Sequence, residues 1–453
     1  MRVCFDLDYT PDQRLDGFWL KVTVISMSFI VFLLLQGGFS FTSADARAPS
    51  SLEWKGRCAE DPIQPVEDWF AAVKHARKAP DFDRVFEISS SLWGKEKTGV
   101  IYAVWVTGGK LAYIYAYKGT SIAKDEYILY YDGKERHRSL RGSSSILAIS
   151  PVENIQDRLT YSTKDRIVFG GFEFLFPPGF KMFSTASVAG KLFVRGLGGT
   201  FYDGKKMPDN VSTFAIGDHI AEKKSVAGKM AFIYKAKEYG KELDGLAGDE
   251  IALCNDRPVY VVGRWPLEKG TGITRHAVHE GQIIGRPYRE IKKIGVVGGA
   301  IVFLAIKEWA SSRQDSKTVL VKNGEEISGK YESVIDFFSH RGHLVYFGSN
   351  RANPADSTAT HYVVQDNQVL YTTAPGEQVL RARGADVVSL GTKLAFLTYD
   401  KEGRQKKFMY NGIEIPQPDY YRIEKILDWN DRLVVWANDY DKRVIQVERR
   451  QKN

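Results

Sequence analysis

Short apolar runs recur along the chain, each opened by glycine or a polar turn residue and followed by a tight turn. Gly109–Tyr113 (GKLAY) precedes Asp132-Gly133, and Gly190–Phe193 (GKLF) precedes Asp203-Gly204. Asp-Gly and Asn-Gly reach positive φ at low cost and close two-residue hairpins between antiparallel strands. Successive residues of such strands point to opposite faces. The pattern therefore predicts one strand–turn–strand unit used many times.

The C-terminal half repeats most regularly. A Tyr-x-x-apolar-x-x-apolar pattern begins at Tyr288, Tyr331 and Tyr420, and an apolar strand follows each copy. The spacings of 43 and 89 residues correspond to one and two units of about 44 residues. A repeated antiparallel unit of this length is typical of a β-propeller. We therefore predict an all-β fold, a single propeller of seven or eight four-stranded blades over residues 86–453.

The N-terminal half of the predicted propeller is less regular, and this leaves the blade number open. Candidate copies begin near Gly109, Asp157, Gly190, Gly228 and Asp256. The last spacing, 28 residues, barely holds four strands, so merging two copies gives seven blades instead of eight. The final apolar segment, 444–447 (VIQV), is expected to pair with early strands and close the ring, which removes exposed sheet edges.

The N-terminus has the pattern of an export signal. Val22–Leu35 is a run of fourteen mostly apolar residues preceded by Lys21, and Ala44-x-Ala46 fits a small-residue cleavage site. We predict a signal peptide over residues 1–46 and a periplasmic or secreted protein. The run is shorter than the ~20 apolar residues that span a bilayer comfortably. The alternative is an uncleaved N-terminal helix that anchors the chain.

Residues 47–85 are predicted to be a linker with one short amphipathic helix. The helix is expected over Pro65–Lys74, where Val66, Trp69, Phe70 and Val73 lie at helical spacing on one apolar face. Pro65 suits the first helical turn. Such a helix would pack against the wall or an end of the propeller.

Two cysteines remain after removal of the predicted signal. Cys58 and Cys254 form an even pair in an exported chain, which favours a disulfide between the N-terminal segment and the middle of the propeller. The alternative is two unpaired thiols.

Composition and net charge limit the kinds of partner that we expect for this protein. Apolar residues make up 43% of the chain and charged residues 26%, as in a globular protein. The formal net charge of +8 is compatible with anionic partners such as lipid head groups or acidic polysaccharide, and equally with a solvated mixed-charge surface. The only dense basic block is the short tail at 449–452, so no nucleic-acid partner is expected.

The sequence indicates no catalytic, cofactor-binding or metal-binding residues. It contains neither a Gly-x-Ser-x-Gly elbow nor a phosphate-binding glycine loop. His276 and His279, like His340 and His343, are three residues apart, and on a strand such residues point to opposite faces. We therefore expect structural roles for all four histidines, and an enzyme is not the favoured interpretation.

The runs Gly109–Tyr113 and Gly228–Phe232 (GKMAF) resemble the repeats of exported bacterial propellers, the Tol-type periplasmic and WD40-like groups. The Trp-Asp ending of true WD40 repeats is missing, and Val435-Trp436-Ala437 is the nearest approach. The resemblance implies a binding platform.

Two functions follow as hypotheses. The first is an exported propeller that binds or scaffolds a macromolecular partner, a protein or envelope glycan, at the cell envelope, through loops such as Asn350–Thr360 and Arg264–Thr274. The alternative is a carbohydrate-active enzyme, a hydrolase or lyase, with its site at the central channel. The sequence leaves the oligomeric state open.

Overall fold

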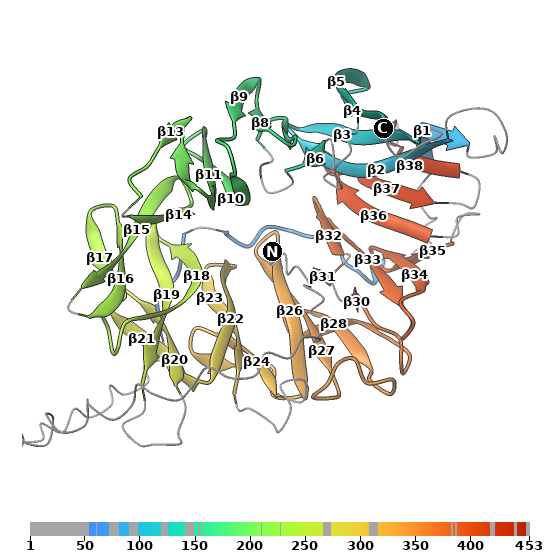
Figure 1. The fold of residues 1–453 in the computed structure, drawn as a ribbon. Coiled ribbons are helices and arrows are strands. Elements are labelled where there is room, and N and C mark those ends of the chain that lie inside the picture. Colours follow the sequence, from blue (N-terminus) through green and yellow to red (C-terminus); the bar gives the residue numbers. More distant parts are fainter. Residues whose placement is uncertain are drawn as a thin grey trace, which may run out of the picture. The chain divides into compact units, whose positions relative to one another are not determined.

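A computed structural model gives the fold of this chain (Figure 1). Residues 51–453 form one unit and residues 1–50 another. The structure describes residues 54–59, 61–71, 81–89, 98–118, 126–140, 149–152, 155, 157–209, 211–226, 228–265, 273–307, 316–381, 384–385, 387–416, 422–438 and 442–449. The predicted signal peptide lies outside these residues.

Residues 82–449 build an all-β propeller of nine four-stranded antiparallel sheets, each of which is one blade. In blades 1 to 8 the strands pair in chain order, and the first strands of several neighbouring blades contact one another. The first strand of each blade is therefore the inner one, and the fourth lies at the rim (Figure 1). The prediction of seven or eight blades was wrong.

Blades 1 to 4 come from the first half of the propeller. Blade 1 holds β2 (Thr98–Thr107), β3 (Lys110–Lys118), β4 (Glu126–Tyr131) and β5 (Lys134–Leu140). Blade 2 holds β6 (Ser150–Pro151), β7 (Thr160–Ser162), β8 (Arg166–Phe169) and β9 (Phe172–Leu175). Blade 3 holds β10 (Lys181–Val188), β11 (Lys191–Leu197), β12 (Gly199–Tyr202) and β13 (Lys205–Lys206). Blade 4 holds β14 (Ser212–Ile216), β15 (His219–Val226), β16 (Lys229–Tyr234) and β17 (Lys237–Tyr239).

Blades 5 to 9 complete the ring. Blade 5 holds β18 (Leu246–Cys254), β19 (Arg257–Arg264), β20 (Thr274–His279) and β21 (Gln282–Tyr288). Blade 6 holds β22 (Glu290–Val297), β23 (Ala300–Ile306), β24 (Thr318–Lys322) and β25 (Glu325–Glu326). Blade 7 holds β26 (Ser333–His340), β27 (His343–Ser349), β28 (His361–Gln365) and β29 (Gln368–Thr372). A two-stranded ribbon follows, β30 (Leu380–Arg381) with β31 (Gly384–Ala385). Blade 8 holds β32 (Val387–Leu390), β33 (Lys393–Tyr399), β34 (Gln405–Tyr410) and β35 (Ile413–Ile415). Blade 9 holds β36 (Arg422–Asp428), β37 (Leu433–Asn438), β38 (Lys442–Glu448) and β1 (Phe82–Ser89).

The predicted number of blades was too low because blades 2 to 4 are short. Blade 3 fits four strands into residues 181–206, far fewer than the unit of about 44 residues that the C-terminal half indicates. Gly228 opens β16, the third strand of its blade, whereas Gly109, Gly190 and Asp256 each precede a second strand. The short spacing from Gly228 to Asp256 therefore joins different positions in two separate blades.

A β-bulge explains why apolar residues recur every three positions on the inner strands. In β22 the register with β23 shifts between Ile291 and Lys293, and in β26 it shifts between Val334 and Asp336. The extra residue reverses the alternation of the strand, so residues three apart share a face. Ile291 and Ile294 accordingly lie in the same apolar cluster.

The chain closes the ring with its first strand. β1 pairs antiparallel with β38, and Asp83 lies opposite Val447 and Glu87 opposite Val444. The inner strand of this blade, β36, contacts β2 of blade 1. The prediction that the last apolar strand pairs with an early one is confirmed.

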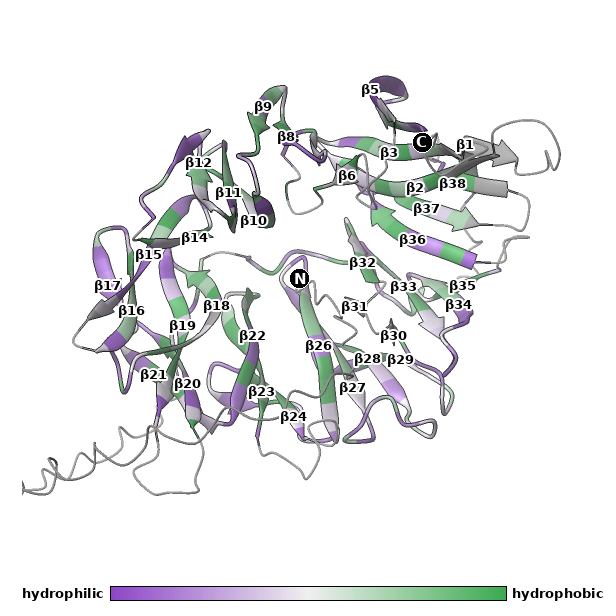
Figure 2. Ribbon diagram, in the orientation of Figure 1, coloured by the Kyte–Doolittle hydropathy of each residue, from purple (hydrophilic) through white to green (hydrophobic). Residues whose placement is uncertain are grey.

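The core lies between adjacent blades. Val302 and Phe303, neighbours on β23, are both fully buried. Phe303 packs in a cluster with Val259 of blade 5, whereas Val302 packs in a cluster with Tyr346 of blade 7. Alternate residues of one strand thus fill two different interfaces, as the period of two predicts. Figure 2 shows the result: β26 is largely hydrophobic, and the rim strand β17 is hydrophilic.

The predicted helix over 65–74 is wrong in its described part. Residues 62–68 adopt no regular secondary structure, Trp69 and Phe70 form a turn, and Ala71, the last described residue of the segment, has a helical conformation. Residues 72–80 lie outside the described residues. Gln64 and Glu67 donate their backbone N–H groups to carbonyls of blade turns, and Pro65 has no N–H, so this stretch bonds to the propeller instead of to itself. No helix in the described part of the chain could cross a membrane.

The two faces of the propeller differ in their connections. Strands 1 and 2, and strands 3 and 4, are joined at one face, mostly by two-residue turns. Asp132-Gly133, Asn323-Gly324 and Asn411-Gly412 have positive φ at both residues, as the sequence predicts. We call this the turn face. The opposite face carries the connections from strand 2 to strand 3 and from one blade to the next, and we call it the loop face.

Candidate binding faces

An N-terminal strap, residues 54–71, crosses the turn face of blades 5 to 8. It is the blue segment that runs across the ring in Figure 1. Its backbone N–H groups donate to carbonyls of successive turns. The bonds are Trp54 to Asn323 at 3.2 Å, Cys58 to Gly299 at 2.7 Å, Gln64 to Arg341 at 2.8 Å and Glu67 to Thr392 at 2.9 Å.

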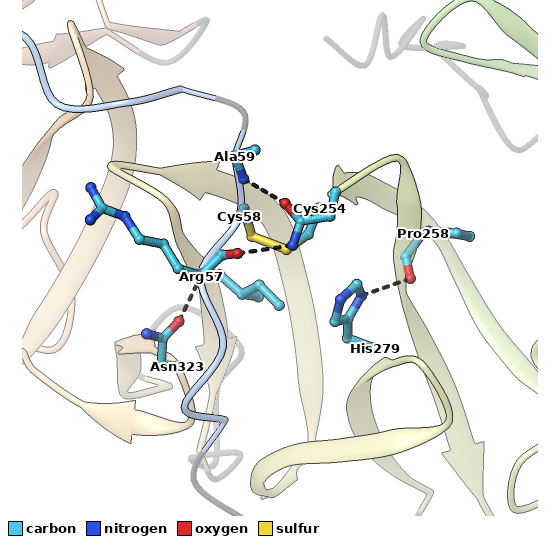
Figure 3. Close-up of a disulfide and its surroundings, with 9 residues drawn as sticks. Arg57, Cys58, Ala59, Cys254, Pro258, His279 and Asn323 are labelled. Carbon is cyan, nitrogen blue, oxygen red and sulfur yellow. Dashed lines mark hydrogen bonds between the residues drawn. A yellow bond between two sulfur atoms is a disulfide. The ribbon is translucent and has the colours of Figure 1, made fainter.

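A disulfide between Cys58 and Cys254 ties the strap to blade 5 (Figure 3). The two Cα atoms are 4.8 Å apart, and both residues are buried. Asn255, in the turn after β18, clamps the strap on both sides of the bond: its Oδ1 accepts from the N–H of Ala59, and its Nδ2 donates to the carbonyl of Arg57 at 2.9 Å. The cysteine pair that the sequence singles out is thus bonded in the structure.

Glycines in the turns let the strap approach closely. Gly342 has φ +80°, and a Cβ at this position would lie only 2.6 Å from Cα of Ile63. Gly299, with φ +76°, would place a Cβ 2.8 Å from Cγ of Arg57. A side chain at either position would both strain the backbone and displace the strap.

The far end of the strap is fixed by an aromatic contact. Trp69 is 7% exposed, and its ring stacks on Phe396 of blade 8 with centroids 5.5 Å apart. Glu67 accepts hydrogen bonds from Thr392 Oγ1 and Asn411 Nδ2, which lie in two turns of the same blade. Over blades 5 to 8 the turn face is therefore occupied by the chain itself.

The exposed apolar side chains gather on the loop face. Five of them lie at the loop-face ends of strands in blades 2 to 5: Leu175, Phe183, Leu197, Met230 and Trp265. Phe183 is 67% exposed, Leu175 62% and Leu197 55%. Clustered exposed apolar side chains on a folded protein mark interaction sites more often than isolated ones do.

The same part of the ring is basic. Residues 181–243, which span blades 3 and 4, contain eleven Lys and Arg against six Asp and Glu, a net charge of +5 out of +8 for the whole chain. Several of these cations pair with carboxylates at the turn face, as Lys191 does with Asp203 at 2.8 Å. Lys181 and Arg195, nearer the loop face, form no ion pair with a described residue.

Both loops singled out from the sequence lie on the loop face. The loop at 350–360 joins β27 to β28. It is braced internally, because the side chain of Asn350 accepts from the N–H of Thr360 and the imidazole of His361 contacts the carbonyl of Pro354 at 2.8 Å. The other loop, between β19 and β20, lies mostly outside the described residues. Its first residue after β19, Trp265, is 63% exposed and donates its N–H to Asp244.

Three of the four histidines contact separate partners. His279 contacts the carbonyl of Pro258 through Nδ1 (Figure 3). Its ring also packs edge-on against Trp54. His340 and His343 lie opposite each other across a hairpin, but His340 contacts Ser389 Oγ at 2.7 Å and His343 contacts Asp366 at 2.5 Å. His276 is buried, and its ring nitrogens have no hydrogen-bond partner among the residues that the structure describes. The described residues contain no group of three or more metal-ligating side chains.

Two charged side chains on neighbouring inner strands, Lys293 and Asp336, form an ion pair. Lys293 of β22 pairs with Asp336 of β26 at 2.8 Å and also donates to the carbonyl of Phe337 at 2.6 Å. Burial, with the nearby charge of His343, lowers the pKa of His340 on β26 to about 4, so this imidazole is neutral at physiological pH.

Sequence reasoning did not find the strap or the exposed loop-face side chains. Trp54, Gln64 and Glu67 bind through backbone groups, which leave no trace in the pattern of side chains. The spacing of Cys58 and Cys254 was the one signal that linked this segment to the middle of the ring.

Comparison with known proteins identifies no family. No family model matches the chain, and neither does any curated protein. Similar solved structures include the β-propeller domain of the Trilobed protease from Pyrococcus furiosus, with 11% identity, a TM-score of 0.30, and coverage of 72% of this chain and 96% of that one.

Two further solved structures are similar at the same low level. For the acylaminoacyl peptidase of Pyrococcus horikoshii the identity is 11% and the TM-score 0.32, with coverage of 76% of this chain and 52% of that one, so the chain spans about half of that protein. For a structure titled as the eukaryotic initiation factor the identity is 10% and the TM-score 0.28, with coverage of 76% and 93%. We transfer no activity from these proteins.

Proposed function

We propose that this protein is an exported propeller that binds or scaffolds a macromolecular partner at the cell envelope through its loop face. The main support for the proposal is that one face of the propeller is covered by the chain itself and the other exposes apolar side chains. The turn face of blades 5 to 8 is covered by the strap, whereas the loop face of blades 2 to 5 exposes five large apolar side chains. A rigid ring that presents loops and apolar side chains on one face suits recognition.

The export pattern over residues 1–46 and the resemblance of GKLAY-type strands to Tol-type and WD40-like propellers support the placement at the envelope. The disulfide supports it as well, because such bonds persist in oxidising compartments. The alternative of a carbohydrate-active enzyme requires acidic, His or Arg side chains that converge on the channel. Lys293 and Asp336, on two neighbouring inner strands, pair with each other, and no contact among the described residues favours the enzyme.

Affinity capture from envelope extracts tests the proposal. The wild-type chain is compared with a loop-face variant, Met230→Ser with Trp265→Ser, and with a turn-face control, Phe172→Ser, whose ring lies beside Gly204 in a blade 3 turn. We expect a specific partner that the wild type and the control retain and the loop-face variant loses. Equal recovery by all three chains, or no specific partner under any condition, would contradict the proposal.

A further inference from the structure

The strongest unexplained surface is a basic and apolar patch at the loop-face end of blade 3, made of Lys181, Phe183, Arg195 and Leu197. Lys181 lies directly opposite Leu197 in the β10–β11 ladder, and Arg195 lies opposite Ser184. Phe183 is the extra residue of a bulge between Met182 and Ser184. We call this group the blade 3 patch.

The apolar members of the patch stand out from the surface instead of lining a groove. A bulged residue leaves the regular ladder, and Phe183 is accordingly two-thirds exposed. Leu197, at the end of β11, is also more than half exposed. Protruding apolar side chains suit insertion into a fluid interface, where the acyl chains adapt to them, better than they suit a shaped peptide, which needs pockets.

The charge of the patch selects an anionic partner. At the turn-face end of the same blade Lys191 pairs with Asp203 at 2.8 Å, and at the rim, beside Gly199, Lys206 pairs with Asp209 at 2.7 Å. Lys181 and Arg195 have no such pair among the described residues, so their charges are free to attract anions. A second copy of the chain is a poor occupant, because it would bring four cations together.

We infer that the blade 3 patch binds an anionic lipid surface, with Phe183 and Leu197 inserted among the head groups and Lys181 and Arg195 against the phosphates. This inference rests on the proposed function and names its partner chemistry. An apolar side chain and an adjacent cation each contribute to interfacial binding, and a Lys or Arg near an anionic surface contributes about fivefold in affinity.

Vesicle binding tests the inference, with the chain purified in the form in which the cell leaves it. Vesicles of phosphatidylcholine alone are compared with vesicles that also contain phosphatidylglycerol. A polarity-sensitive dye is attached at Ser184→Cys, inside the patch, or at Lys205→Cys, an exposed position at the turn face. We expect a blue shift from the dye at position 184 only, with the anionic vesicles only, and a weaker shift as salt rises.

Variants separate the two contributions. In the dye-labelled background, Lys181→Glu with Arg195→Glu should lower the apparent affinity by more than tenfold, and Phe183→Ser with Leu197→Ser should lower it by about tenfold. Phe172→Ser should leave it unchanged. All these side chains are exposed or half-buried, so the fold should survive, and circular dichroism checks this.

Three outcomes would overturn the inference: a shift of equal size with neutral vesicles, the same shift from position 205, or affinity unaffected by the patch variants. Binding of an acidic amphipathic peptide, with no vesicle response, would assign the patch to a protein partner. The proposed function would then stand while the lipid inference failed. Capture experiments that also yield no partner would mean that both fail.

Discussion

Removal of the Cys58–Cys254 disulfide should loosen the strap and lower the stability of the whole chain. The bond closes a loop across 196 positions of sequence. Loop-closure entropy for a loop of that length corresponds to about 5 kcal/mol, an upper value, and removal of native disulfides typically costs about 2–5 kcal/mol. Both cysteines are buried, so their replacement by alanine adds a small packing loss.

The variant Cys58→Ala with Cys254→Ala is therefore expected to lose about 2–5 kcal/mol in the free energy of unfolding. Loosening of the strap should appear under milder conditions than unfolding of the whole chain. The strap amides of Cys58, Gln64 and Glu67 bond to turn carbonyls, and without the covalent tie they should exchange with solvent faster. Hydrogen exchange of residues 54–71 measures the local effect, and urea unfolding followed by tryptophan fluorescence measures the global one.

Reductant provides the matched control. The wild-type chain treated with reductant should behave as the double variant does, and reductant should not change the double variant. Unchanged strap exchange together with an unchanged unfolding midpoint would refute the reasoning, because the strap would then be held without the bond.

Three further predictions concern the strap and the core. Trp69→Ala removes the ring that stacks on Phe396 and should cost about 3–5 kcal/mol in the free energy of unfolding. The loss should appear first as faster amide hydrogen exchange in residues 64–71, while blades 1 to 3 stay protected. Uniform loss of protection would contradict this prediction. Gly403→Ala, at φ +75° with no atom near its Cβ position, should cost only the backbone strain, about 1–3 kcal/mol. Gly342→Ala, at φ +80° against Ile63, should cost more than this, because its Cβ also meets the strap backbone. Equal urea midpoints would argue against strap contact at Gly342. The pKa of His340 is lowered from 6.5 to about 4 in the folded chain. Between these pH values the unfolded chain takes up a proton that the folded chain does not. The free energy of unfolding should therefore fall as the pH drops from about 6.5 toward 4. His340→Gln should flatten that part of the urea midpoint against pH, and an unchanged profile would exclude His340 as its source.

The sequence predicted the elements well because hairpin turns are local. Asp203-Gly204 and Asn411-Gly412 adopt positive φ whatever surrounds them, and each lies in a two-residue turn where the pattern placed one. The closing strand at 444–447 was also predictable, since an apolar strand at the end of a ring needs a partner.

Blade number and the strap were not predictable, for different physical reasons. A blade is held by its neighbours, so blade 3 tolerates strands of only four and two residues, β12 and β13, without a change in sequence period that marks the boundary. The apolar spacing of Pro65–Lys74 favours a helix in isolation. A short helix is marginal in water, and backbone bonds to the blade turns, with Trp69 packed on Phe396, win instead.

The most direct test of the loop face as the binding surface is photo-crosslinking in cells that express the chain. A photoreactive amino acid replaces Phe183 on the loop face or, in parallel, Phe172 beside the blade 3 turn. The account predicts crosslinked products, to lipid or to protein, from position 183 and none above background from position 172. Products from position 172 alone, or the same products from both positions, would contradict it.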